Sequence, residues 1–87
     1  MLFHVTERFR GDPAPVYARF RERGRMTPDG VEYVASWVTD DLSTCFQVME
    51  AEDRAALDAW IERWSDLVDF EVELVITSAE AAKRANQ

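Results

Sequence analysis

The sequence is poor in cysteine, histidine and glycine. Its 87 residues include one cysteine, Cys45, and one histidine, His4. A single cysteine cannot close a disulfide within the chain, and no basic segment followed by an apolar one opens the sequence, so we expect a cytoplasmic protein. The glycines, Gly11, Gly24 and Gly30, are isolated, which excludes a glycine-rich phosphate-binding loop.

Long apolar runs and an excess of positive charge are also missing. No stretch approaches the roughly 18 apolar residues that a membrane-spanning helix needs. The net charge is −7, which argues against a nucleic acid or an anionic membrane as partner. The acidic residues and the one histidine lack the convergent spacing of a metal site, and we predict neither a metal ion nor another cofactor. Residues 1–25 carry six arginines against three acidic residues, so this segment is either a solvated surface or an edge that attracts anions.

Large apolar residues are, by contrast, abundant. Hydrophobic residues make up 47% of the chain, and three residues are Trp. A chain of this length buries only roughly 60 to 65% of the surface that its unfolded form exposes. The sequence therefore holds more apolar surface than a monomer of its size readily buries, and we predict a homodimer.

The hydrophobic pattern predicts two helices and four strands. Asp12 and Pro13 mark the start of a helix that ends near Gly24. A second helix starts at the cap residue Asp53, and apolar residues recur along it with helical spacing as far as Val68. The strands are predicted at residues 2–6, on either side of Asp40–Asp41 within residues 31–50, and at residues 70–76.

The order strand, helix, strand, strand, helix, strand is the ferredoxin-like arrangement of an α+β domain. Right-handed crossovers then place both helices on one face of a four-stranded antiparallel sheet, with the first and third strands at its centre. We assign residues 1–78 to this single domain and residues 79–87 to a C-terminal tail that forms a short helix or frays. The other face of the sheet receives no cover from this chain.

Four sequence runs carry a resemblance to a known family. They are ERFRGDPAPVYARFRERGRM, YVASW, CFQVMEAED and W-x3-W-x-DLVDFEV. With these runs the sequence resembles a family of short bacterial proteins, domain of unknown function 3303, and the resemblance implies a fold and no activity. By wider analogy of fold, the chain is similar to the dimeric α/β-barrel group, in which two ferredoxin-like sheets pack through their helix-free faces. This analogy implies a homodimer of the dimeric α/β-barrel type.

The alternation of side chains along a strand places a candidate ligand site on the helix-free face. With Phe3 and Val5 facing the helices, His4 points to the helix-free face. With Phe46 and Val48 also facing the helices, Gln47 points the same way as His4 and forms a polar pair with it in an apolar setting. The face of Trp37 depends on the hairpin register, since a shift of one residue reverses it. The candidate ligand-binding residues are His4, Tyr33, Trp37, Cys45 and Gln47.

Two functions are consistent with these features. In the first, a homodimer binds a small apolar or aromatic molecule at the helix-free face, or serves only assembly, with His4 and Gln47 as a structural pair. In the second, the protein is a cofactor-independent monooxygenase or isomerase of the dimeric α/β-barrel type, with His4 as base or hydrogen-bond donor. We favour the first, because one histidine, one cysteine and no catalytic triad leave catalysis few groups to use.

Overall fold

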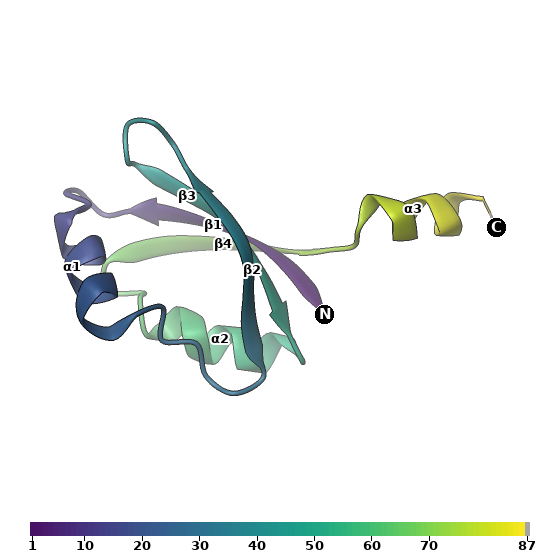
Figure 1. Ribbon diagram of the computed structural model, residues 1–87, viewed down its shortest axis with the longest axis horizontal. Helices are drawn as coiled ribbons and strands as arrows, with labels where there is room; N and C mark the ends of the chain where they lie inside the picture. Colours follow the sequence, from purple (N-terminus) through teal and green to yellow (C-terminus); the bar gives the residue numbers. More distant parts are fainter. Residues whose placement is uncertain (87) are drawn as a thin grey trace.

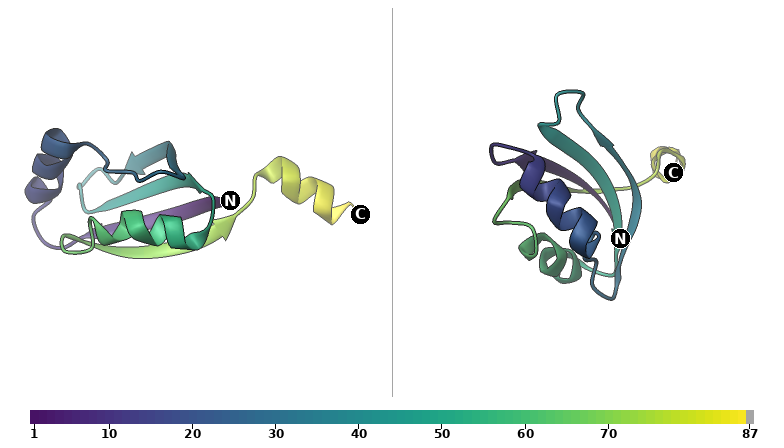
Figure 2. Two further views of the ribbon diagram at one scale, coloured as in Figure 1. Left: turned by 90° about the horizontal axis from the view of Figure 1, so that it is seen from below. Right: turned by 60° about the vertical axis from the view of Figure 1, so that its left-hand side comes forward.

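The computed structural model describes residues 1–86. Its elements are β1 (Leu2–Phe9), α1 (Ala14–Arg23), β2 (Val31–Val38), β3 (Thr44–Ala51), α2 (Arg54–Glu62), β4 (Val68–Val75) and α3 (Ser78–Ala85). The four strands form one antiparallel sheet in the order β2-β3-β1-β4 (Figure 1). Both α1 and α2 lie on the same face of this sheet (Figure 2). The predicted ferredoxin-like α+β fold is confirmed, with the first and third strands at the centre.

Helix α2 covers much of the sheet. Asp53 precedes it and accepts a hydrogen bond from the backbone N–H of Ala56 (2.8 Å), as expected for a helix cap. The side chains of Leu57 and Trp60 are fully buried, and Trp64, just beyond the helix, is buried as well. Together with apolar residues of β1, β2 and β3 they form the hydrophobic core. The apolar stripe read from the sequence is therefore the core side of this segment.

Several element boundaries differ from the prediction. The helical pattern continues to Val68, but α2 ends at Glu62 and Val68 begins β4. Hydrogen-bonded turns follow the helix, and one of them joins the Val68 N–H to the Trp64 carbonyl (3.1 Å). These turns keep the spacing of a helix, which explains the apolar pattern. Strand β1 also extends beyond the predicted end to Phe9, and this extension brings Glu7 into the sheet.

Helix α1 lies over the sheet without burying any of its own residues. The carboxylate of Asp12 accepts from the N–H of Ala14 (2.9 Å) at its start, and Gly24, with φ of 68°, ends it. Arg19 binds both carboxylate oxygens of Asp66 at 2.8 and 2.7 Å. The helix is thus held at the loop between α2 and β4, which leaves space between α1 and the sheet.

The register of β1 and β3 decides which side chains face the helices. It pairs Val5 with Gln47 and Glu7 with Cys45, so all four side chains lie on the helix-covered face. The expectation that Phe46 faces the helices is wrong, because Phe46 is 37% exposed whereas Gln47 is 3% exposed. Strand β3 carries large side chains on both faces, so its hydrophobicity alone could not determine the orientation.

A β-bulge changes the orientation of side chains along β2. Tyr33 pairs with Met49 on the helix-covered face, whereas Trp37 pairs with Phe46 on the helix-free face. The register shifts between Tyr33 and Ala35, where the bulge inserts an extra residue. Regular alternation would have kept Tyr33 and Trp37 on one side, and the bulge separates them.

The C-terminal segment leaves the sheet after β4. Helix α3 lies away from the body of the domain in both views (Figures 1 and 2). It spans Ser78–Ala85 and so begins one residue before the predicted tail of residues 79–87, and Gln87 lies outside the described residues. None of the helices within residues 1–86 is both long enough and apolar enough to span a membrane.

Candidate functional site

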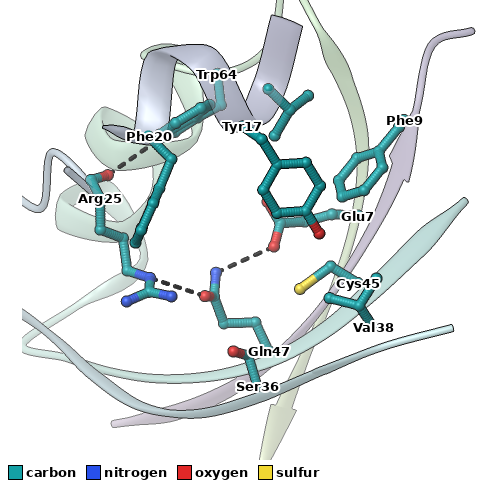
Figure 3. A pocket seen from close by; sticks show the side chains of 11 residues that line it. Glu7, Phe9, Tyr17, Phe20, Arg25, Ser36, Val38, Cys45, Gln47 and Trp64 are labelled. Carbon is teal, nitrogen blue, oxygen red and sulfur yellow. Dashed lines mark hydrogen bonds between the residues drawn. The ribbon is translucent and has the colours of Figure 1, made fainter. Parts of the chain in front are cut away.

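A cavity of about 230 Å³ lies between α1 and the helix-covered face of the sheet. Side chains of α1, β1, β2 and β3 turn toward this space (Figure 3). Its aromatic walls are formed by Phe9, Tyr17, Phe20 and Trp64. Its principal polar groups come from Glu7, Arg25, Ser36 and Gln47. Helix α1 closes the cavity on one side, through Val16, Tyr17 and Phe20.

A chain of hydrogen bonds joins three polar side chains along the cavity. The amide oxygen of Gln47 accepts from Nε of Arg25 (3.0 Å), and the amide nitrogen donates to Oε2 of Glu7 (3.1 Å). Because the amide nitrogen must donate and the oxygen must accept, these two partners fix its orientation. The Gln47 amide therefore lies between the carboxyl group of Glu7 and the guanidinium of Arg25 (Figure 3).

Arg25 is held in place by aromatic side chains. The indole N–H groups of Trp60 and Trp64 both donate to the backbone carbonyl of Arg25, each at 3.0 Å. Its guanidinium carbon lies 3.6 Å from the centre of the Tyr33 ring and 5.2 Å from that of Phe20. Cation–π contacts of this kind favour the charged side chain in a fixed position. The buried stripe of α2 thus also positions a charged group of the cavity.

Glu7 is only 7% exposed, and the burial of its carboxyl group changes its acidity. Burial raises the pKa of Glu7 to about 7, whereas the Cys45 thiol and the charge of Arg25 lower it by less. Glu7 therefore changes its protonation state near neutral pH. Burial and the nearby Glu7 raise the pKa of the Cys45 thiol to about 12, so this thiol stays protonated at neutral pH and is a poor nucleophile.

The structure separates the five predicted site residues into two groups. Gln47 and Cys45 line the cavity, and Tyr33 contacts it through the guanidinium of Arg25. His4 and Trp37 lie on the opposite, helix-free face of the sheet. The predicted His4–Gln47 pair does not form, because the two side chains project from opposite faces.

On the helix-free face, His4 has apolar neighbours. Its ring stacks on that of Phe46, with 6.2 Å between the ring centres. Val48, which was placed with the helices by the same argument as Phe46, pairs with His4 in the sheet. Trp37 is 63% exposed beside Phe46. This face carries an apolar patch of Trp37, Phe46 and Val48, which we call the aromatic patch.

The prediction missed Glu7 and Arg25, the two charged groups of the cavity. For Glu7 a signal exists, because Phe3, Val5, Glu7 and Phe9 alternate along one face of β1. A longer predicted strand would have placed this carboxyl group among core residues. Arg25 follows the glycine that ends α1 and has no periodic pattern around it. Its position depends on tryptophans more than 30 residues away and could not be read from its neighbours.

Comparisons with known proteins identify the family and support the fold. Residues 1–87 match the family described as Domain of unknown function (DUF3303), and the chain belongs to that family. No curated protein sequence matches the chain.

Two solved structures are similar to this one. The crystal structure of protein Atu4242 from Agrobacterium tumefaciens is 15% identical, with a TM-score of 0.57, and the match covers 90% of this chain and 94% of that one. The structure of Rv0793 from Mycobacterium tuberculosis is 17% identical, with a TM-score of 0.54, over 91% of this chain and 99% of that one. At these identities the similarity supports the shared ferredoxin-like, dimeric α/β-barrel type of fold.

Proposed function

We propose that this protein is a homodimer that binds a small, mainly aromatic molecule in the cavity between α1 and the sheet. The observation that carries the proposal is the cavity itself, which combines aromatic walls with the Glu7–Gln47–Arg25 chain. Small-molecule sites are typically apolar concavities with a few well-placed polar groups. The proposed site lies on the opposite side of the sheet from the helix-free face considered first.

The size of the cavity supports a ligand with a substituted ring. An apolar cavity of about 150 Å³ accommodates benzene. The present cavity has about 230 Å³, which leaves room for a ring with substituents. The aromatic side chains of Tyr17, Phe20 and Trp64 provide surfaces on which such a ring would pack.

Ligand binding can be tested by changing the volume of the cavity at one position. The side chain of Cys45 points into the cavity (Figure 3). Cys45→Leu would fill part of the space, and Cys45→Ala would enlarge it. We expect ring compounds identified by ligand-detected NMR to bind the wild type and Cys45→Ala, and to lose binding to Cys45→Leu. If both variants bind the same compounds equally well, the ligands occupy another site.

The aromatic patch on the helix-free face supports the homodimer. Trp37 is 63% exposed and Phe46 is 37% exposed, and they are neighbours in the sheet. Large exposed aromatic side chains on one flat surface favour association with a matching surface, and a second copy of this chain supplies one. A stable contact would bury about 1,200 Å² or more in total.

The homodimer can be tested independently of the cavity, because the sheet separates the two. We expect sedimentation to show a dimer for the wild type and a monomer for Trp37→Glu. Leu42→Glu is the matched control, since Leu42 is an exposed apolar residue in the β2–β3 turn. A wild-type monomer at micromolar concentration, or a dimer that persists in Trp37→Glu, would contradict the proposed interface.

A second candidate function is cofactor-independent catalysis, as a monooxygenase or isomerase. The raised pKa of Glu7, about 7, is the observation that favours it, because a general base works best when its pKa is near the working pH. His4 was the predicted base, but it lies outside the cavity. The test is turnover of compounds that bind, with Glu7→Gln expected to bind but not to react.

A further inference from the structure

Glu7 and Arg25 both line the cavity, and both retain hydrogen-bonding capacity. Glu7 accepts from Gln47 through Oε2 and interacts with the Cys45 thiol, and no nitrogen or oxygen donor other than Gln47 bonds to its carboxyl group within residues 1–86. Arg25 donates from Nε to Gln47, and in the same part of the chain its terminal nitrogens bond to no acceptor. The cavity thus presents a strong acceptor, the Glu7 carboxylate, and a strong donor, the Arg25 guanidinium. The Gln47 amide lies between the two groups.

A hydroxyl group is suited to Glu7, because it donates one hydrogen bond to the carboxylate and carries its oxygen into the field of the Arg25 charge. A carboxylate ligand only accepts, and it would place a second negative charge beside Glu7. The other titratable groups that face Glu7 are the Cys45 thiol of β3 and the Tyr17 hydroxyl of α1, and both are neutral at neutral pH. Arg25 and Glu7 are the charged residues that line the cavity within residues 1–86, and their charges balance above about pH 7, where Glu7 is ionised.

We propose that the cavity binds a ring compound with a weakly acidic hydroxyl, a phenol or an enol, whose proton Glu7 accepts while Arg25 faces the oxygen. In this transfer the ligand O–H bond breaks and a bond forms between the proton and a Glu7 carboxylate oxygen. The negative charge moves from Glu7 to the ligand oxygen, beside the guanidinium. No proton is exchanged with the solvent. This inference rests on the proposed function, because it concerns the ligand of the same cavity.

The acidity of Glu7 determines which hydroxyl groups would transfer their proton. An ordinary phenol has a pKa near 10, which is higher than the value of about 7 for Glu7. An ordinary phenol would therefore share its proton with Glu7 and keep most of it. A phenol that titrates near neutral pH would transfer it. We expect affinity to increase with the acidity of the hydroxyl group until the ligand is ionised in water.

Three probes with one ring system test the inference. In para-nitrophenol the phenol and phenolate forms absorb at different wavelengths, para-nitroanisole replaces the hydroxyl with a methyl ether, and para-nitrobenzoate carries a carboxylate. We expect the wild type to bind para-nitrophenol at least about tenfold more tightly than para-nitroanisole, the effect of one hydrogen bond to a charged group. Near pH 7, where Glu7 is partly ionised, the bound probe should show a larger phenolate fraction than the free probe at the same pH.

Variants assign the effect to Glu7. In Glu7→Gln the preference for para-nitrophenol over para-nitroanisole and the larger phenolate fraction should both be lost. Glu62→Gln makes the same chemical change on the exposed surface of α2 and should leave both unchanged.

The possible outcomes separate this inference from the proposed function. Equal binding of para-nitrophenol and para-nitroanisole to the wild type would refute the hydroxyl inference and leave a general ring-binding cavity. Tightest binding of para-nitrobenzoate would refute it in favour of a site for carboxylates at Arg25. Binding of none of the three probes would contradict both the inference and the proposed function.

Discussion

The raised pKa of Glu7 predicts an unusual dependence of stability on pH. The folded protein binds the Glu7 proton more tightly than the unfolded chain does, because the pKa is about 7 in the fold against the model-peptide value of 4.5. The unfolded chain releases this proton first as pH rises, so the contribution of Glu7 to stability is full below about pH 4.5 and is lost as pH increases through about 7. Between about pH 5 and about pH 8 the loss amounts to roughly 2.5 kcal/mol.

The other groups with shifted pKa values do not titrate in this interval. The pKa of Asp66 is lowered to about 2, mainly by its hydrogen bond to Arg19, and that of Cys45 is raised to about 12. Hydrogen bonds from Ser43 and Thr39 lower the pKa of Asp41 below its usual range, so this group is also ionised throughout. The contribution of Glu7 to the pH dependence of the unfolding free energy in this interval can therefore be measured by comparing the wild type with Glu7→Gln.

The assay is urea unfolding at several pH values, followed by the fluorescence of the buried tryptophans. We expect the wild type to lose about 2.5 kcal/mol of unfolding free energy from about pH 5 to about pH 8, relative to Glu7→Gln. Glu62→Gln, on the exposed surface of α2, should follow the wild type. Protein concentration must be held constant, because the stability of a homodimer depends on it. If wild type and Glu7→Gln show parallel profiles, Glu7 is not buried as a carboxyl group with raised pKa.

Two further predictions concern the packing of α2 and the turn between β2 and β3. Trp64→Ala should lower the unfolding free energy by roughly 3 to 5 kcal/mol in denaturant titration, because it removes a buried ring and its bond to the Arg25 carbonyl. A loss below about 1 kcal/mol would contradict this packing. Leu42 has φ of 60°, which glycine adopts without strain, so Leu42→Gly should raise the melting temperature and the unfolding free energy by about 0.5 to 1 kcal/mol. A destabilised variant would show that the Leu42 side chain makes a contact that offsets the backbone strain.

The sequence was sufficient to predict the fold because its signals are local. The cap at Asp53 and the spacing of Leu57, Trp60 and Trp64 identify the second helix from adjacent residues. The order of helices and strands then leaves few topologies, since crossover connections are right-handed. The paired strands confirm the topology that follows from these rules.

The candidate site could not be predicted in the same way, because its position depends on register and on distant contacts. Strand β3 has large side chains on both faces, and a polar residue, Gln47, points toward the helices. Hydrophobicity favours the opposite assignment, with Phe46 inside. The bulge after Tyr33 then separates residues that regular alternation would group together.

Two polar residues, Gln47 and Glu7, are buried where apolar residues are usual, and both line the proposed site. A buried polar group is costly without partners, and here the partners come from β1 and from the segment after α1. A small domain has little stability to spare, and apolar residues at both positions would pack the core without a cavity. Side chains that line a cavity also lack the packing contacts that a filled core provides. An arrangement that lowers stability in this way is typical of functional sites, and a bound ring compound would restore the missing contacts.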